Sequence, residues 1–151
     1  MVNELLSGAA ALGLELNEAQ IAAFERYAAL LVEKNAVMNL TAITAPAEIA
    51  RLHFLDSLAL LRLADLREKR VLDVGCGAGF PGVPLKIGEP SIRLSLLDST
   101  AKRMAWLSGE LLPALGLEAE IGSIAPGKAA DFVVCDADFN RKEVYIDGEK
   151  V

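Results

Sequence analysis

The feature that most constrains this chain is a cluster of glycines directly after a short apolar run. The run, residues 70–74, reads Arg-Val-Leu-Asp-Val, and glycines follow at Gly75, Gly77 and Gly79. Glycine adopts backbone conformations that other residues avoid, and it lets a ligand approach the main chain closely. Between a strand and a helix, such a loop exposes backbone N–H groups. The pattern predicts a strand, a binding loop and a helix.

The segment after the loop repeats this order of elements. A helix is expected over residues 81–87, a second strand over residues 92–98 and a second helix over residues 100–112. A strand–helix–strand–helix order of this length predicts a parallel sheet with right-handed crossovers. We therefore expect an α/β fold built on a small, Rossmann-like sheet.

The segment before the first strand, residues 1–65, is expected to form a helical subdomain. Asn17 and Gln20 have the spacing of a capping box at the start of a helix. Thr44 is expected to cap a second helix, with Pro46 in its first turn, where a missing N–H costs nothing. Apolar residues at helical spacing predict the buried stripe of this second helix. They are Ile49, Leu52, Leu55 and Leu58.

Composition indicates a globular protein of one domain. The chain has 151 residues, of which 53% are hydrophobic and 24% charged. We expect no membrane segment, because no apolar stretch reaches the length of a span, and no secretory signal is visible. Cys76 and Cys135 lack the spacing of metal ligands, so we expect no metal site and a reduced, cytoplasmic protein.

The net charge of −6 is unfavourable for an RNA partner, because phosphate contacts supply most of the affinity for nucleic acids. The acidity is uneven along the chain. Residues 1–117 hold 11 Lys/Arg against 13 Asp/Glu, a net of −2, and residues 118–151 hold 4 against 8, a net of −4. The acidic tail is therefore the part that would most repel RNA.

Two acidic residues separate this loop from a loop that binds a dinucleotide. Asp73 ends the first strand, where a carboxylate would repel a pyrophosphate but suit the ammonium group of S-adenosylmethionine. Asp98 ends the second strand, where a carboxylate can accept hydrogen bonds from both ribose hydroxyls. A G-x-G-x-x-G pattern at residues 77–82 is weak evidence alone. The acids and glycines together favour S-adenosylmethionine, and the plainer alternative is a glycine-rich turn with two surface acids.

Five short motifs carry a resemblance to a known family. They are Asn39-Leu40-Thr41, His53-Phe54-Leu55-Asp56-Ser57, the loop Gly77-Ala78-Gly79-Phe80-Pro81-Gly82-Val83-Pro84-Leu85, Leu97-Asp98-Ser99 and the pair Lys102-Arg103. Over about residues 20–117, the chain resembles the glucose-inhibited-division B family of bacterial small-subunit ribosomal RNA guanine-N7 methyltransferases. The resemblance implies S-adenosylmethionine as cofactor and ribosomal RNA as partner.

The resemblance also implies roles for particular residues. It implies cofactor contacts at Gly75, Gly77, Gly79 and Asp98, and positions near the substrate for Asn39 and His53. His53 either packs between the helical subdomain and the sheet or lines a guanine pocket. Lys102 and Arg103 either bind RNA phosphate or are only solvated. Leu52 departs from the family pattern, in which a basic residue precedes the histidine.

The tail resembles a different family. Residues 113–151 are similar to the extreme C-terminus of amidohydrolases, most closely N-acetylglucosamine-6-phosphate deacetylase, through the Gly-Ser-Ile-Ala-Pro-Gly-Lys motif that begins at Gly122. The third strand and the fourth-strand Arg-Ala pair of the methyltransferase family are not found. We therefore expect a chimera, in which residues 66–117 are the first half of a methyltransferase fold and residues 118–151 are a grafted β tail.

The tail is expected to form two strands, over residues 131–136 and 142–151, with a turn at residues 147–148. The apolar segment Phe132–Cys135 is expected to pair in parallel with the first strand, residues 70–74, in place of the missing fourth strand. A sheet this small leaves edges unpaired, and unpaired edges pair with other chains. Homodimerisation through sheet edges or exchange of the tail is therefore expected.

Two hypotheses for function remain open. In the first, the chain is an RNA methyltransferase in which guanine N7 attacks the methyl group without a general base, so that catalysis is mainly positioning. In the second, it is a non-catalytic recombinant or chimeric domain that retains the fold and at most weak cofactor binding. The missing second half of the methyltransferase fold favours the second hypothesis for this chain, and the first describes the origin of its parts. We therefore expect weak binding of S-adenosylmethionine and no methyl transfer from this chain.

Overall fold

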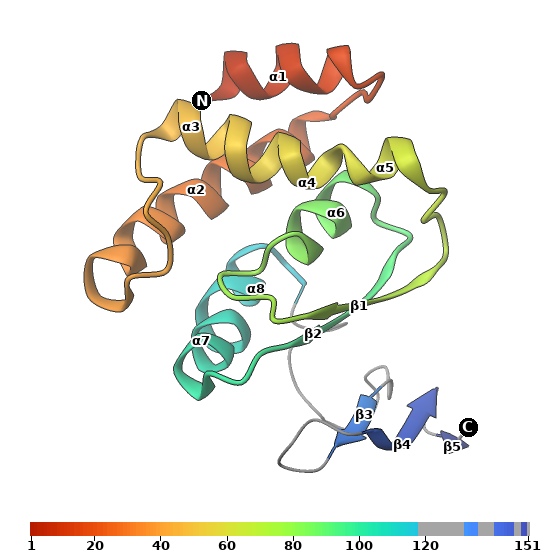
Figure 1. The fold of residues 1–151 in the computed structure, drawn as a ribbon. Coiled ribbons are helices and arrows are strands. Elements are labelled where there is room, and N and C mark those ends of the chain that lie inside the picture. The colour runs from red at the N-terminus through yellow and green to blue at the C-terminus, as the bar shows by residue number, and fades with distance from the viewer. Residues whose placement is uncertain (118–131, 136–140, 147–148, 151) are drawn as a thin grey trace.

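The computed structural model describes residues 1–117, 132–135, 141–146 and 149–150. Figure 1 shows a layer of helices above a short pair of strands, with one helix, α6, between them. The helical layer holds α1 (Val2–Ala11), α2 (Glu18–Met38) and a nearly continuous stretch from α3 to α5. The mixed helix and sheet composition confirms the α/β fold that the sequence predicts.

The start of α2 confirms the predicted capping box. The side chain of Asn17 accepts a hydrogen bond from the backbone N–H of Gln20, and the side chain of Gln20 accepts one from the backbone N–H of Asn17, both at 2.9 Å. The helix ends at Met38, and the next residue, Asn39, has a left-handed backbone (φ 49°). Asparagine tolerates this conformation better than most residues do, so it terminates the helix at low cost.

The second helical stretch begins one residue later than predicted. Ala45 is the N-cap of α3, without a side-chain hydrogen bond, so the prediction that Thr44 caps this helix is wrong. Pro46 occupies the first turn, as predicted, and it favours an extended backbone at the residue before it. That preference makes Ala45 the N-cap and Pro46 the first residue of the helix. The stretch comprises α3 (Pro46–Ile49), the π-helix η1 (Ala50–Leu55), α4 (Asp56–Leu58) and α5 (Leu60–Leu63).

Two parallel strands form the sheet beneath these helices. β1 (Arg70–Val74) pairs with β2 (Arg93–Leu97) in a register that sets Val74 beside Leu97. The crossover helix α6 (Gly82–Gly88) is buried over residues 82–87, because it lies against the strands on one side and against α2 and α4 on the other. After β2 come α7 (Ala101–Trp106), η2 (Leu107–Leu111) and α8 (Leu112–Ala114).

One continuous hydrophobic core joins the helical layer to the strand pair. Its members come from every part of the chain between α1 and α8, and the largest are aromatic. The fully buried aromatic side chains are Phe24, Tyr27, Phe54 and Trp106. The expected subdomain boundary near residue 65 lies between α5 and β1, and the division into subdomains and tail stays a prediction.

The strands of the tail form a separate sheet. β3 (Phe132–Cys135) pairs with β4 (Arg141–Ile146), and β4 pairs with β5 (Glu149–Lys150), both in antiparallel orientation. The prediction that Phe132–Cys135 pairs in parallel with β1 is therefore wrong. Strands close in sequence pair as a hairpin at a lower loop-closure cost than a pairing with a distant strand. The expected turn at residues 147–148 and the expected amidohydrolase motif lie outside the described residues.

Candidate functional site

The glycine loop connects the end of β1 to the start of α6. It begins where the N–H groups of Gly75 and Cys76 both donate to the carbonyl oxygen of Leu97, at 2.7 and 3.1 Å. It returns into the helix through a bond from the N–H of Val83 to the carbonyl oxygen of Gly79, at 2.8 Å. The loop therefore lies at the C-terminal ends of both strands, the edge at which open α/β sheets bind ligands.

The three predicted glycines divide into two kinds. All three have positive φ angles, 78° at Gly75, 57° at Gly77 and 101° at Gly79. Within the described residues, a Cβ atom added at Gly75 would meet nothing within 4 Å, and one at Gly77 would meet only the Gly75 carbonyl oxygen, at 3.9 Å. A Cβ atom at Gly79 would lie 2.7 Å from the hydroxyl of Tyr27. Gly75 and Gly77 thus border open space, and Gly79 packs against the protein.

Asp98 ties the residues after β2 to the glycine loop. One carboxylate oxygen accepts the N–H of Gly77 at 2.9 Å, and the other accepts the N–H of Thr100 at 2.7 Å. Burial raises the pKa of Asp98, but these two donors, a hydrogen bond from the Thr100 side chain and the guanidinium of Arg103 at 3.8 Å together hold it below the usual value. Asp98 is therefore an ionised, oriented carboxylate beside the open face of the loop.

Asp73 lies beneath the loop and is only 8% exposed. Its Oδ2 accepts the N–H of Gly82, the first residue of α6, at 2.9 Å. Burial raises the pKa of Asp73, the bond from Gly82 opposes this, and the nearby charge of Asp98 adds to it. Asp73 thus anchors the helix that follows the loop. The predicted contact between Asp73 and an ammonium group stays a prediction.

A stack of aromatic rings supports the loop from the side of the helices. The ring of Phe80 lies between the rings of His53 and Tyr27. The ring centroids are 4.4 Å apart for His53, with an interplanar angle of 13°, and 5.2 Å apart for Tyr27, with an angle of 9°. The hydroxyl of Tyr27 donates to the carbonyl oxygen of Ala78 at 2.6 Å. Burial raises the pKa of Tyr27 well above the usual value, so this hydroxyl stays a donor at neutral pH. The helical layer therefore contacts the glycine loop directly.

His53 lies at the junction between η1 and the loop. In addition to its stack on Phe80, its Nε2 is 2.8 Å from the hydroxyl of Thr41. Burial lowers the pKa of His53, and Asp56 opposes the shift. The structure brings His53 to the loop, and its position accommodates both of the roles considered for it, packing and contact with a guanine.

The other predicted substrate residues differ in their relation to the loop. Asn39 terminates α2 and is exposed. Lys102 is exposed on α7, and Arg103, on the same helix, lies 3.8 Å from Asp98. Arg103 is therefore the residue of the pair that approaches the candidate site.

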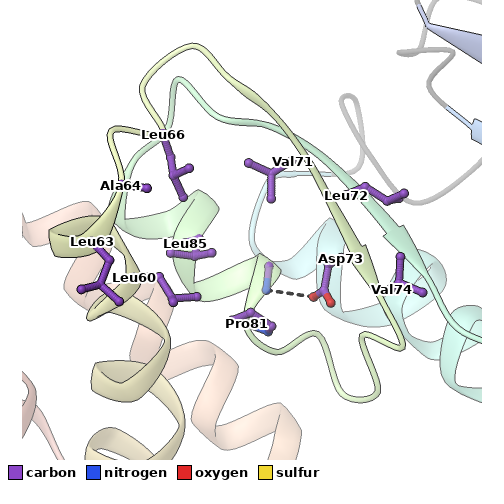
Figure 2. A pocket seen from close by; sticks show the side chains of 11 residues that line it. Leu60, Leu63, Ala64, Leu66, Val71, Leu72, Asp73, Val74, Pro81 and Leu85 are labelled. Atoms are coloured by element: carbon purple, nitrogen blue, oxygen red, sulfur yellow. Dashed lines mark hydrogen bonds between the residues drawn. The ribbon is translucent and has the colours of Figure 1, made fainter. Parts of the chain in front are cut away.

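An apolar pocket of about 320 Å³ borders β1 on the edge away from β2 (Figure 2). Figure 2 shows Leu60 and Leu63 of α5 on one side, Val71 and Val74 of β1 on the other, and the Asp73–Gly82 hydrogen bond between them. Several of these apolar side chains are exposed, with Leu63 at 82% and Val74 at 68%. We call this surface, formed by Leu60, Leu63, Leu72 and Val74, the open edge.

Sequence reasoning missed Tyr27 and Thr41 as residues of the site. Tyr27 follows Phe24 by three residues in the apolar stripe of α2, so the sequence marks it as buried, but nothing local indicates where its hydroxyl binds. Thr41 stands in the quoted family motif. Among the described residues, no group of three or more His, Cys, Asp or Glu side chains could hold a metal ion.

No helix among residues 1–117 has both the length and the apolar character needed to cross a membrane.

The parallel strands, the glycine loop and the oriented acid after the second strand are typical of an α/β protein that binds a cofactor containing a nucleoside. This is the class that the fold and the site define.

Comparison with known families narrows the class. The model of the family GidB, rRNA small subunit methyltransferase G, matches residues 20–140. The chain belongs to this family, which confirms the resemblance found in its motifs. The match extends beyond residue 117, where that resemblance was expected to end, and includes much of the tail. The amidohydrolase graft stays a prediction.

Relatives in several bacteria carry the name ribosomal RNA small subunit methyltransferase G. The chain is 44% identical to the protein of Pelotomaculum thermopropionicum over 119 residues, which are 78% of this chain and 49% of the relative. It is 47% identical to a protein of Dehalococcoides mccartyi over 116 residues, 77% and 49%. A Thermoanaerobacter protein is 43% identical over 131 residues, 86% and 53%. The chain spans about half the length of these relatives.

Proposed function

We propose that this chain binds S-adenosylmethionine at the glycine loop and forms the cofactor-binding part of a small-subunit ribosomal RNA methyltransferase. The observation that carries the proposal is the open space at Gly75 and Gly77 beside the carboxylate of Asp98. Membership of the family supports it. Because the chain spans about half of its relatives, the activity of a whole relative is itself part of the proposal.

The residues of the loop fit the proposed cofactor. Asp98 uses one lone pair of each oxygen for the N–H groups of Gly77 and Thr100. The side chain of Thr100 also donates to this carboxylate, and the lone pair that remains can accept a ribose hydroxyl. Asp73 adds negative charge beneath the loop, which favours a cationic amino-acid group over a pyrophosphate. We assign Gly75 and Gly77 to the close approach of the cofactor.

The chemistry asks little of the side chains. When bound, S-adenosylmethionine supplies an electrophilic methyl group. Guanine N7 carries a lone pair and needs no general base, so the chain would act by holding the two reactants in line. The proposed partner is ribosomal RNA, whose guanine must leave its stack before a protein pocket can hold it.

The proposed place for the guanine is a pocket of about 400 Å³ beside the loop. His53, Asp56 and Phe80 are among the residues that line it. The stacked rings of His53 and Phe80 offer an aromatic edge next to the loop, and unstacked bases bind to such groups. We propose that Lys102 contacts RNA phosphate, and that Arg103 does so only by leaving Asp98.

Calorimetric titration with S-adenosylmethionine tests the cofactor. We expect a weak dissociation constant, micromolar or above, that weakens further in Gly77→Val and in Asp98→Ala. The valine would fill the open space, and the alanine would remove the acceptor for ribose. A submicromolar affinity that neither substitution weakens would show that the cofactor binds elsewhere.

Transfer of a labelled methyl group to small-subunit RNA tests the activity. We expect none from this chain alone, because it spans about half the length of the relatives that it matches. Transfer that depends on Asp98 would contradict this expectation and show that the chain is a working enzyme.

The proposal extends to assembly and location. We propose that a second copy of this chain covers the open edge, because β1 pairs on one side only within the described residues and its apolar side chains are exposed. We also propose a cytoplasmic location. Ribosomal RNA is found there, and the buried Cys76 is a free thiol.

A further inference from the structure

Three side chains from three parts of the fold hold the glycine loop in place. Asp73, on β1, accepts the N–H of Gly82, and Asp98, after β2, accepts the N–H of Gly77. The third is Tyr27 of α2, which donates to the carbonyl oxygen of Ala78. We propose that Tyr27 is a positioning residue for the cofactor loop, an inference that rests on the proposed binding of S-adenosylmethionine there.

The hydrogen bond of Tyr27 fixes the orientation of one peptide group in the loop. The peptide between Ala78 and Gly79 is held at both ends. Its carbonyl oxygen accepts the Tyr27 hydroxyl at 2.6 Å, and its N–H donates to the carbonyl oxygen of Cys76 at 2.7 Å. A peptide is planar, and in the trans form its C=O and N–H point in opposite directions. Two bonds on opposite sides therefore leave this group no freedom to rotate.

The same contact accounts for Gly79. A Cβ atom at this position would lie 2.7 Å from the Tyr27 hydroxyl and 3.0 Å from Cγ2 of Val83, and its φ of 101° is strained for any other residue. Gly75 and Gly77 have no such neighbours among the described residues. Gly79 is thus a glycine so that the tyrosine can reach the loop, and the other two leave room for a ligand.

The tyrosine ring itself is fixed. Tyr27 is fully buried, with Phe80 stacked on it at 5.2 Å and Phe54 at 5.3 Å. Phe80 belongs to the loop, so Tyr27 of α2 contacts the loop both through its ring and through its hydroxyl. Phe24, three residues earlier on α2, packs in the same cluster at 4.8 Å from Phe54. Its place in the core without a hydroxyl makes Phe24 a matched control.

The experiment compares Tyr27→Phe with Phe24→Leu in the whole chain. Tyr27→Phe keeps the ring and removes only the hydroxyl, and Phe24→Leu loosens the same cluster. Each variant is titrated with S-adenosylmethionine by calorimetry, and the exchange of the Gly79 amide hydrogen is followed by NMR. We expect Tyr27→Phe to weaken binding by about tenfold, the effect of one lost hydrogen bond, and to speed Gly79 exchange. Phe24→Leu lowers the melting temperature but changes neither quantity.

The two readouts separate the possible failures. Unchanged binding and unchanged Gly79 exchange in Tyr27→Phe would overturn the positioning role, and so would equal changes in Phe24→Leu. If the unmodified chain binds no S-adenosylmethionine, the proposed function fails. The exchange of Gly79 then still decides whether Tyr27 holds the loop.

Discussion

The carboxylate of Asp98 accepts the backbone N–H of Gly77 at 2.9 Å, and this bond joins the end of β2 to the open part of the glycine loop. Its second oxygen accepts the N–H of Thr100, just before α7. One buried side chain therefore orients two segments at once. Because both oxygens are used, the geometry depends on a carboxylate and not on an isosteric amide.

This dependence predicts different results for asparagine at the two acidic positions. In Asp98→Asn, the single carbonyl oxygen can accept from Gly77 or from Thr100 but cannot serve both, and we expect a loss of about 1–3 kcal/mol of unfolding free energy. In Asp73→Asn, the carbonyl oxygen can still accept the N–H of Gly82, so we expect a much smaller loss. Urea unfolding of both variants measures the difference. Equal losses would contradict the assignment of both Asp98 oxygens.

The pH dependence of stability provides a second measure of Asp98. Its pKa in the folded protein is held below the usual value. Its contribution to stability is therefore complete above the unfolded pKa of about 3.9 and is lost as the pH falls through the lower, folded pKa. Unfolding measured between about pH 6 and about pH 2 should show a smaller decrease in unfolding free energy on acidification in Asp98→Asn than in the unmodified chain. An identical decrease in both proteins would mean that other groups cause it.

The glycines predict opposite responses to alanine. A Cβ atom at Gly82 would lie 2.8 Å from Oδ2 of Asp73 and 2.9 Å from Cδ1 of Leu94, so Gly82→Ala should cost about 1–3 kcal/mol through overpacking. Gly109 lies in η2, and a Cβ atom there would meet nothing within 4 Å. Gly109→Ala should therefore stabilise the chain by about 0.5–1 kcal/mol. Thermal unfolding of the two variants tests both signs, and the same sign for both would be inconsistent with this packing.

His53 is the only histidine, so its titration can be followed without overlap. Burial lowers its pKa in the folded protein below the usual value of about 6.5. The folded state then binds fewer protons than the unfolded state, so stability should rise as the pH rises toward about 6.5 and level off above it. NMR titration measures the pKa of the ring. Comparing the pH dependence of unfolding in His53→Phe with that of the unmodified chain measures the contribution of His53 to stability. A ring pKa above the unperturbed value of about 6.5 would contradict the burial of His53 against Phe80.

Local signals were enough to predict much of the fold. The Asn17–Gln20 capping box involves residues only three apart in the sequence. The strands β1 and β2 coincide with apolar runs that a glycine or an acidic residue terminates. The stripe of the second helical stretch was only partly correct, because Leu52 is 44% exposed and Phe54 is buried in its place. η1 is a π-helix, whose wider turn rotates the side chains away from the 3.6-residue period.

Long-range contacts were beyond prediction from the sequence. Tyr27 is 51 residues from the carbonyl group that it binds, and nothing in its local pattern separates a buried hydroxyl with a partner from an ordinary core residue. The prediction that Phe132–Cys135 pairs with β1 was also wrong. An apolar strand fits several sheet edges, and this strand pairs with β4, its nearest partner in the sequence. The site residues next to glycines were found because a glycine cluster after a strand is itself a local signal.

The open edge predicts how the chain behaves at rising concentration. Within the described residues, β1 pairs only with β2, and Leu63 and Val74 beside the free side are 82% and 68% exposed. An apolar, unpaired strand edge pairs with another chain unless charge or bulk prevents it. We therefore expect sedimentation equilibrium to show a dimer whose fraction falls in Val74→Lys. Val37→Lys is the matched control, because Val37 is 77% exposed at the end of α2, away from the strands. A monomer at all concentrations, or equal effects of the two lysines, would show that a second copy does not cover this edge.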